Sequence, residues 1–220
     1  MLKKSILSLM ILCVISQTAG LANTIIFQQG VNEYTGSRDC SIFPGMTKAA
    51  TNRTTLGFTS NETGGVKYVL FKFINLEIPV GHKVVSAQLV LENLRSGSPG
   101  REIEIWSVKR PWNEKSCNWE CWIVNQQWEL PGGTGEKDRS KTPVATATIN
   151  NEKKGFITID LPVDLVQGWI LKTTPNHGFM LTSKSPAVNE LFRASETSLV
   201  DKRPKLIIKT ASKANNLKKH

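Results

Sequence analysis

The 220-residue chain carries 28 lysines and arginines against 18 aspartates and glutamates, so its formal net charge at pH 7 is +10. Such a charge favours acidic partners, which outside the cytoplasm are anionic polysaccharides, cell-wall polymers, lipid surfaces or nucleic acids; the alternative is a solvated surface with no partner. Beyond the N-terminal region no segment approaches the ~20 apolar residues of a transmembrane helix, which excludes a membrane-spanning helix there.

Residues 1–22 have the pattern of a secretory signal peptide. Two lysines, Lys3 and Lys4, precede an apolar run over residues 6–15, and Gly20 and Ala22 stand where a signal peptidase reads small residues. Cleavage after Ala22 removes two lysines and no acid, which leaves a mature charge of +8 from 26 basic and 18 acidic residues. We therefore expect a secreted protein, extracellular or periplasmic.

The segments that follow read mainly as strands. Their apolar residues alternate or form short β-branched runs, and Gly, Pro and Asn turns separate them. The expected strands are 24–29, 66–74, 83–94, 102–108, 144–149, 155–161, 177–183 and 205–210. One short helix is expected at 162–172, where Pro162 can begin a turn and where Val163 and Val166 share a face with either Trp169 or Ile170.

Many short strands in a chain of this length predict a single all-β domain. We expect an antiparallel β-sandwich of jelly-roll type over residues 23–210. The basic segment 211–220 lacks apolar periodicity, and we expect it to be a disordered tail.

Four segments resemble, in order, the motifs of the DNRLRE domain family, which is related to the disaggregatase-related repeats. They are residues 67–93, 110–133, 157–181 and 192–210. In the second, the family's "W.E", "W" and "W..PGG" are matched by Trp112 with Glu114, by Trp119, and by Trp128 followed by residues 131–133. The resemblance implies a β-sandwich module of extracellular proteins, some of whose members bind carbohydrate, including acidic polysaccharides.

Most of the motif residues are expected to be structural. Large aromatic side chains bury ~150 to 250 Å² each and would hold a polar loop in one shape. Glu114 is expected to accept hydrogen bonds from backbone N–H groups, and Arg203, before Pro204, to fix the start of the last strand by hydrogen bonding. The structural set is Trp112, Glu114, Trp119, Trp128, Trp169 and Arg203.

Two tryptophans are expected to bind ligand instead. If Ile103 and Ile105 face the core, period-two alternation turns Trp106 toward water, where an indole can stack on a sugar ring. Trp122 directly follows Cys121, so a disulfide there would fix its position. The alternative for Trp106 is burial at a bulge or a sheet edge.

Basic residues next to these aromatics complete the expected ligand site. Lys109, Arg110 and Lys115 could meet the carboxylates or sulfates of an acidic sugar, and an Arg guanidinium can bind a carboxylate in bidentate fashion. The alternative is that these side chains are simply solvated.

Three cysteines remain after processing. In an oxidising compartment Cys117 and Cys121 are the expected disulfide, with Cys40 either free or competing for one of them. A zinc site lacks a fourth ligand, so no metal–thiolate centre is expected. Structural calcium could take oxygens from the loop 132–138 or from a pair of aspartates, Asp160 and Asp164.

No catalytic motif accompanies the histidines. His82 and His177 lie in turns, and His220 lies in the tail. We therefore expect a non-enzymatic module that binds polysaccharide, and no nucleic acid, because no motif of that class occurs and the chain has an export signal. The rival predictions are a structural or adhesive module that binds protein or the cell envelope and, less favoured, a small secreted hydrolase.

Overall fold

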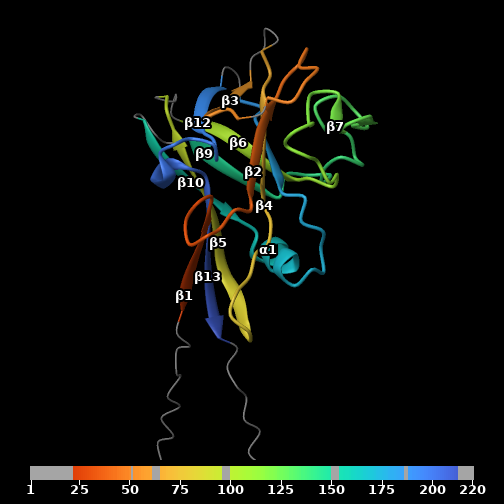
Figure 1. Cartoon of the computed structure of the whole chain (residues 1–220). Helices are drawn as coiled ribbons and strands as arrows, with labels where there is room; N and C mark the ends of the chain where they lie inside the picture. The colour runs from red at the N-terminus through yellow and green to blue at the C-terminus, as the bar shows by residue number, and fades with distance from the viewer. Residues whose placement is uncertain are drawn as a thin grey trace, which may run out of the picture.

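Two antiparallel sheets form the body of the molecule (Figure 1). The computed structural model describes residues 22–50, 52–60, 65–95, 100–149, 154–185 and 188–212. The predicted signal peptide therefore lies outside the described residues except for its last residue. Of the predicted tail, residues 211 and 212 belong to the last strand, and residues 213–220, with His220, lie outside the described residues.

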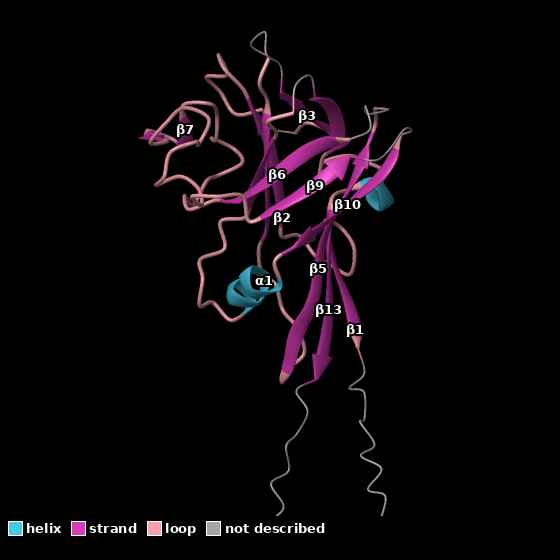
Figure 2. Cartoon of the chain, turned by 180° about the vertical axis from the view of Figure 1, so that it is seen from behind, coloured by secondary structure: helices cyan, strands magenta, loops and turns pink. Residues whose placement is uncertain are grey.

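The first sheet is built around a long central strand, β5, which pairs with β13 along one edge and with β10 along the other. Its strand order is β1-β13-β5-β12-β3. The bounds are β1 (Asn23–Gln28), β3 (Thr55–Ser60), β5 (His82–Asn93), β10 (Gly155–Leu161), β12 (Val188–Arg193) and β13 (Lys205–Ser212). The ends of β1, β13 and β5 project together beyond the rest of the sandwich (Figure 2).

The second sheet has the order β2-β4-β11-β6-β9. Its strands are β2 (Ser37–Ile42), β4 (Tyr68–Phe73), β6 (Arg101–Ser107), β9 (Ala145–Ile149) and β11 (Phe179–Thr182). The core between the sheets takes alternate residues of these strands, including Phe71 of β4, Ile103 of β6 and Phe179 of β11. The structure thus confirms the all-β sandwich and each of the expected strands, with small shifts of their ends.

A change of periodicity within β5 is matched by an irregularity in its partner. Val84 is buried, and the next buried positions on the same strand are Ala87 and Leu89, so the alternation skips one residue. The register with β13 shifts between Lys209 and Thr210. A β-bulge at this point lets both halves of the strand turn their apolar residues to the core.

The predicted helix is confirmed as α1 (Val163–Ile170). Val166 and Trp169 are its buried apolar residues, and the helix packs against β5. Gly168 is required by close packing, because a Cβ there would lie 2.8 Å from the Thr174 hydroxyl oxygen. A 3-10 turn, η1 (Val200–Lys202), leads into β13.

Between β6 and β9 the chain leaves the sandwich to form a compact lobe, residues 108–144, which we call the tryptophan lobe (Figure 1). It contains a short hairpin, β7 (Cys121–Ile123) and β8 (Gln126–Gln127). Its base is closed where Lys109 N–H donates to the Asp138 carbonyl at 2.7 Å and Ser140 N–H to the Ser107 carbonyl at 2.8 Å.

Candidate functional site

The tryptophan lobe is anchored to the sandwich by indole side chains. Trp112 and Trp128 are buried, as predicted, and both donate their Nε1–H groups. Trp112 donates to the His177 carbonyl at 2.8 Å and Trp128 to the Asn118 carbonyl at 3.0 Å. These two tryptophans are buried side chains that hold the polar lobe in one shape.

The Pro-Gly-Gly turn of the lobe fits around two indoles. Gly132 and Gly133 have positive φ angles of 78° and 67°. A Cβ on Gly132 would lie 2.5 Å from the ring of Trp119, and one on Gly133 would lie 3.1 Å from that of Trp128. Trp119 is half-buried and lies 5.6 Å from the ring of Tyr68, so the prediction that it packs structurally is confirmed.

Two structural predictions outside the lobe are also confirmed. Arg203 donates from Nε to the Thr197 carbonyl at 2.9 Å and from Nη1 to the Gln29 carbonyl at 2.8 Å, which fixes the chain ahead of β13. Trp169 is buried in the main core, with its ring stacked 5.9 Å from that of Phe179.

The expectation that Trp106 faces water is wrong. The residue is 7% exposed, its Nε1–H donates to Thr182 Oγ1 at 2.8 Å, and the Arg139 guanidinium carbon lies 3.7 Å from the ring centre. The alternation itself is correct, since Ile103 and Ile105 do face the sandwich core. The opposite face of the sheet is also buried, because the tryptophan lobe covers it.

This covered face is a second hydrophobic core. It takes outward-facing residues of the second sheet and inward-facing residues of the lobe. The buried members are Cys40, Ile42, Leu70, Trp106, Val108, Trp112, Cys117, Trp128 and Met180. The indole of Trp106 is therefore part of an interface within the chain, and sugar stacking on it is ruled out by burial.

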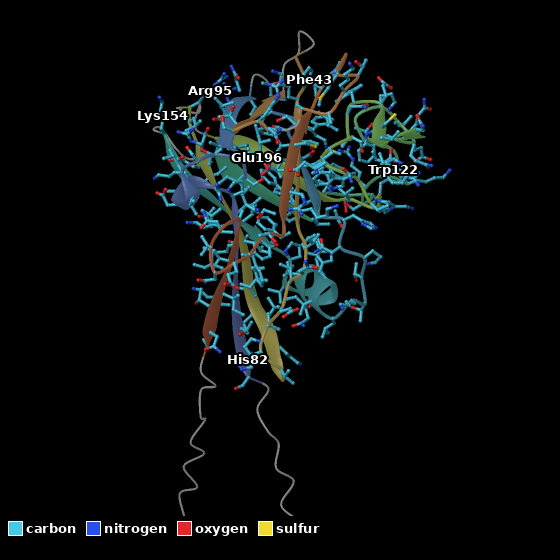
Figure 3. The ribbon with its side chains drawn as sticks, viewed as in Figure 1. Phe43, His82, Arg95, Trp122, Lys154 and Glu196 are labelled. Atoms are coloured by element: carbon cyan, nitrogen blue, oxygen red, sulfur yellow. The ribbon has the colours of Figure 1, made fainter. Side chains whose placement is uncertain are left out.

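The remaining residues of the predicted ligand site do not form one cluster of free side chains. Lys109 Nζ donates to the Glu136 carbonyl at 2.7 Å, and Arg110 is paired with the buried Asp138 at 3.2 Å. Trp122 is half-buried on the outer part of the lobe (Figure 3), and Lys115 is exposed. Of the five predicted residues, Trp106 is buried, Arg110 and Trp122 are half-buried, and Lys109 and Lys115 are exposed.

Asp138 lies in the loop 132–138, which was expected to offer oxygen ligands to calcium, and its carboxylate instead holds the lobe together. Its carboxylate accepts the backbone N–H groups of Glu129, Leu130 and Gly135 at 3.0 to 3.2 Å, in addition to Arg110. These donors already neutralise and solvate a fully buried carboxylate. Asp138 therefore serves the loop itself.

The expected Cys117–Cys121 disulfide is not formed. Cys40, Cys117 and Cys121 are free thiols in the structure. Cys117 is buried beneath the lobe in hydrogen-bond contact with Cys40, and this contact together with burial raises the pKa of the Cys40 thiol well above its ordinary value. Cys121 is only half-buried at the start of β7, so the lobe's short hairpin does not bring it to Cys117.

Lys115 lines a cavity that sequence reasoning did not anticipate. It has a volume of about 240 Å³ and lies where the lobe meets β2 and β4; we call it the basic groove. Its lining residues are Arg38, Lys72, Ile74, Trp112, Asn113, Glu114 and Lys115. Three cations and a single carboxylate thus face one small cavity.

Two of these cations are directly opposed across a strand pair. Arg38 of β2 stands opposite Lys72 of β4 in the antiparallel register. Lys72 Nζ donates to the Trp112 carbonyl at 2.8 Å and lies 4.7 Å from the centre of the Trp112 indole ring. Burial, and then the charge of Arg38, lower the pKa of Lys72 from its ordinary value.

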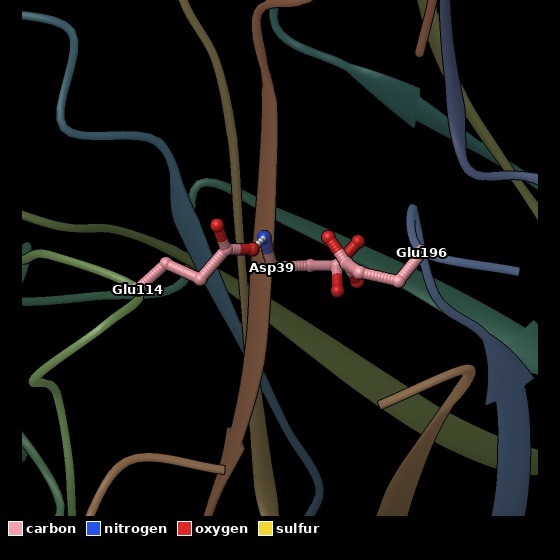
Figure 4. A group of neighbouring side chains, drawn as sticks. All are labelled: Asp39, Glu114 and Glu196. Atoms are coloured by element: carbon pink, nitrogen blue, oxygen red, sulfur yellow. Dashed lines mark hydrogen bonds between the residues drawn. The ribbon is translucent and has the colours of Figure 1, made fainter. Parts of the chain in front are cut away.

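Beside the basic groove lies a carboxylate triad, Asp39, Glu114 and Glu196 (Figure 4). One oxygen from each carboxylate lies within 4.8 Å of the others. Glu114 Oε1 accepts the backbone N–H of Asp39 at 2.8 Å, which confirms the prediction that Glu114 accepts a backbone donor. Asp39 Oδ2 accepts the N–H of Ser195 at 2.8 Å, and the Ser195 hydroxyl donates to Glu196.

The triad holds unfavourable negative charge in a partly buried place. Burial raises the pKa of Asp39 well above its ordinary value, and the carboxylates of Glu196 and Glu114 raise it further. Burial also raises the pKa of Glu114, against the lowering effect of its bond to the Asp39 N–H. Grouped oxygens of this kind can hold a proton or a hard cation.

Comparison with known proteins adds no relative. No family model and no curated protein matches the chain. The likeness to the DNRLRE domains therefore remains a prediction based on the four segments.

The two described histidines, His82 and His177, are not members of the triad. His82 Nδ1 lies 3.1 Å from the Thr210 hydroxyl, at the end of the molecule far from Trp122 (Figure 3). His177 contributes its backbone carbonyl to Trp112.

Within the described part of the chain, no helix is long and apolar enough to cross a bilayer.

Sequence reasoning missed Asp39, Glu196, Arg38 and Lys72 as site residues. They are brought together only by the pairing of β2 with β4 and by the segment that follows β12. The sequence offered one signal. β2 contains the adjacent charged residues Arg38 and Asp39 and few apolar side chains. Such a composition is unusual for a strand that is buried on both faces.

Proposed function

We propose that the protein is a secreted, non-catalytic module that binds an anionic polysaccharide, with the basic groove receiving a carboxylate or sulfate of the polymer. The observation that carries the proposal is the pairing of Arg38 directly opposite Lys72. Like charges facing each other across two strands destabilise a sheet, and a bound anion would relieve that repulsion. Lys115 adds a third cation from the lobe.

The size of the groove fits this role. A cavity of about 240 Å³ is smaller than the ~300 to 1,000 Å³ typical of pockets that enclose a small molecule. It therefore suits one acidic substituent of a polymer whose other units remain outside. The half-buried indole of Trp122 on the lobe would offer a stacking surface to a neighbouring sugar.

The overall charge and the resemblance support the same class of partner. A mature charge of +8 attracts polyanions over long range, whereas a shaped site keeps them when salt screens that attraction. The resemblance to DNRLRE domains implies a module of extracellular proteins, some of whose members bind carbohydrate.

Affinity electrophoresis tests this proposal. The mature protein is run through gels that contain alginate, chondroitin sulfate or a neutral glucan, at low ionic strength and at ~0.15 M salt, where the screening length is ~8 Å. We expect retention by one acidic polymer to persist at the higher salt and the neutral glucan to retain nothing. Loss of all retention at the higher salt would show that net charge alone was responsible.

A second candidate function is adhesion to a protein or to the cell envelope. Apolar side chains are exposed on β1 and on the projecting end of β5, with Ile26 40% and Val85 51% exposed. Substitution of both residues by aspartate would then abolish adhesion to envelope fractions and leave retention by acidic polymers unchanged.

A further inference from the structure

The carboxylate triad contains a buried oxygen with no partner. Asp39 is 4% exposed, and its Oδ1 atom accepts no hydrogen bond from the described residues. Burying an ionised carboxylate oxygen without a donor or a counter-charge is costly. The other oxygen, Oδ2, is satisfied by the Ser195 N–H. Something that is not a protein donor is therefore expected to satisfy Oδ1.

Basic side chains act on the triad only from a distance: the charges of Arg38 and Lys72 lower the pKa of Glu114 without pairing with it directly. In the described ranges, no lysine or arginine forms an ion pair with Asp39, Glu114 or Glu196. Each of the three carboxylates is already held in place by a backbone N–H or a hydroxyl: Glu114 by the Asp39 N–H, Asp39 by the Ser195 N–H, and Glu196 by the Ser195 hydroxyl. The cluster is thus preorganised, with three carboxyl groups and no basic side chain paired with them in the described residues.

We propose that Asp39, Glu114 and Glu196 bind one hard divalent cation, calcium. Oxygens that lie within 4.8 Å of one another can share a Ca²⁺ ion, which takes six to eight oxygen ligands at ~2.3 to 2.6 Å. The carboxylates supply three of these and water the rest. Water can enter because Glu196 is exposed and because Glu114 and Glu196 line a second cavity of about 240 Å³.

The three ligands come from parts of the chain far apart in sequence. Asp39 lies on β2, Glu114 on the tryptophan lobe, and Glu196 on the segment after β12. A bound cation would therefore tie the lobe and the C-terminal segment to the edge of the second sheet. It would hold Glu114 and Lys115, and with them one wall of the basic groove, without itself requiring a polysaccharide.

Calorimetric titration of the metal-free protein with CaCl₂, in the absence of any polymer, tests the proposal. We expect one Ca²⁺ per chain with a Kd near 10⁻⁴ to 10⁻³ M, the range of extracellular modules. At ~10 mM Ca²⁺, binding of that strength raises Tm by roughly 3 to 10 °C for a domain of this size. No binding heat and no Tm shift at this concentration would overturn the proposal.

Variants locate the site. We expect Glu196→Gln and Asp39→Asn each to weaken calcium binding at least tenfold, whereas Glu77→Gln, which removes an exposed carboxylate elsewhere, leaves it unchanged. A smaller loss in either triad variant would overturn the assignment. If Asp39→Asn does not fold, as judged by circular dichroism, Glu114→Gln takes its place, since an amide oxygen can still accept the Asp39 N–H.

Discussion

The side chain of Trp106 lies between a strand of the second sheet and the lobe that the same chain folds over that strand. Its ring faces the Arg139 guanidinium, and its N–H is bonded to Thr182. These contacts of the indole are all within the chain, so the side chain stabilises the packing of the lobe on the sheet.

Truncation of this side chain measures that role. We expect Trp106→Ala to lower the free energy of unfolding by about 3 to 5 kcal/mol, because it leaves a cavity beneath the lobe and removes the hydrogen bond that the Thr182 hydroxyl oxygen accepts. Trp122→Ala, at a half-buried position, is expected to cost about 1 kcal/mol. Urea denaturation followed by circular dichroism gives both values. Equal losses for the two variants would contradict the burial of Trp106.

At single residues, sequence reasoning succeeded where one local rule decides the outcome. Trp112, Trp128 and Arg203 pack and bond as expected, because a large aromatic in a polar loop, or an Arg before a strand, has few alternatives. The exposure of Trp106 was mispredicted because antiparallel sheets commonly have one face in water, whereas both faces of this sheet are covered. The consecutive apolar residues 69–71 of β4 and 179–181 of β11 do indicate two buried faces.

Among the elements, β2 connects the sandwich, the lobe and the candidate sites. Its outward residues Arg38 and Cys40 face the basic groove and the second core, and Asp39 on the opposite face joins the triad. The strand lies at a sheet edge, where Glu114 of the lobe satisfies the backbone N–H of Asp39. The position of the lobe is thus linked to that of β2.

The contact between Cys40 and Cys117 gives a prediction at this scale. Treatment of the mature protein with oxidised glutathione is expected to link these two cysteines, because their thiols are already in contact, and so to join β2 to the lobe covalently. Peptide mapping without reduction identifies the pair. Cys121→Ser is expected to leave the cross-link intact. A Cys117–Cys121 peptide in the native protein would contradict the packing of the lobe.

Strands with regular apolar alternation were predictable, and five others were not: the short β7 and β8 of the lobe, and β2, β3 and β12 of the sandwich. β2, β3 and β12 were missed, because each combines polar residues with buried positions, as in the Ser-Arg-Asp-Cys-Ser-Ile sequence of β2. Their polar groups are buried through hydrogen bonds to distant segments, such as Ser41 Oγ–H to the Gly57 carbonyl at 3.0 Å. Tertiary contacts of this kind leave no periodic pattern.

For the whole molecule, the excess positive charge is less informative than its arrangement. The exposed Lys83 and Lys209 lie on the projecting end of β5 and β13. Arg38 and Lys115 instead converge with Lys72 on one cavity next to three carboxylates. Removing two positive charges from the groove and, in another variant, two from the projecting end therefore distinguishes binding at a shaped site from a general attraction to polyanions.

The most direct test is the affinity of an acidic oligosaccharide, taken from the polymer that retains the protein, for two charge-matched double variants at ~0.15 M salt. We predict that Arg38→Gln with Lys115→Gln weakens binding at least tenfold, while Lys83→Gln with Lys209→Gln changes it by less than about twofold. Calorimetry gives both constants, and Tm values confirm that the variants are folded. Equal losses in the two double variants would contradict the basic groove as the binding site.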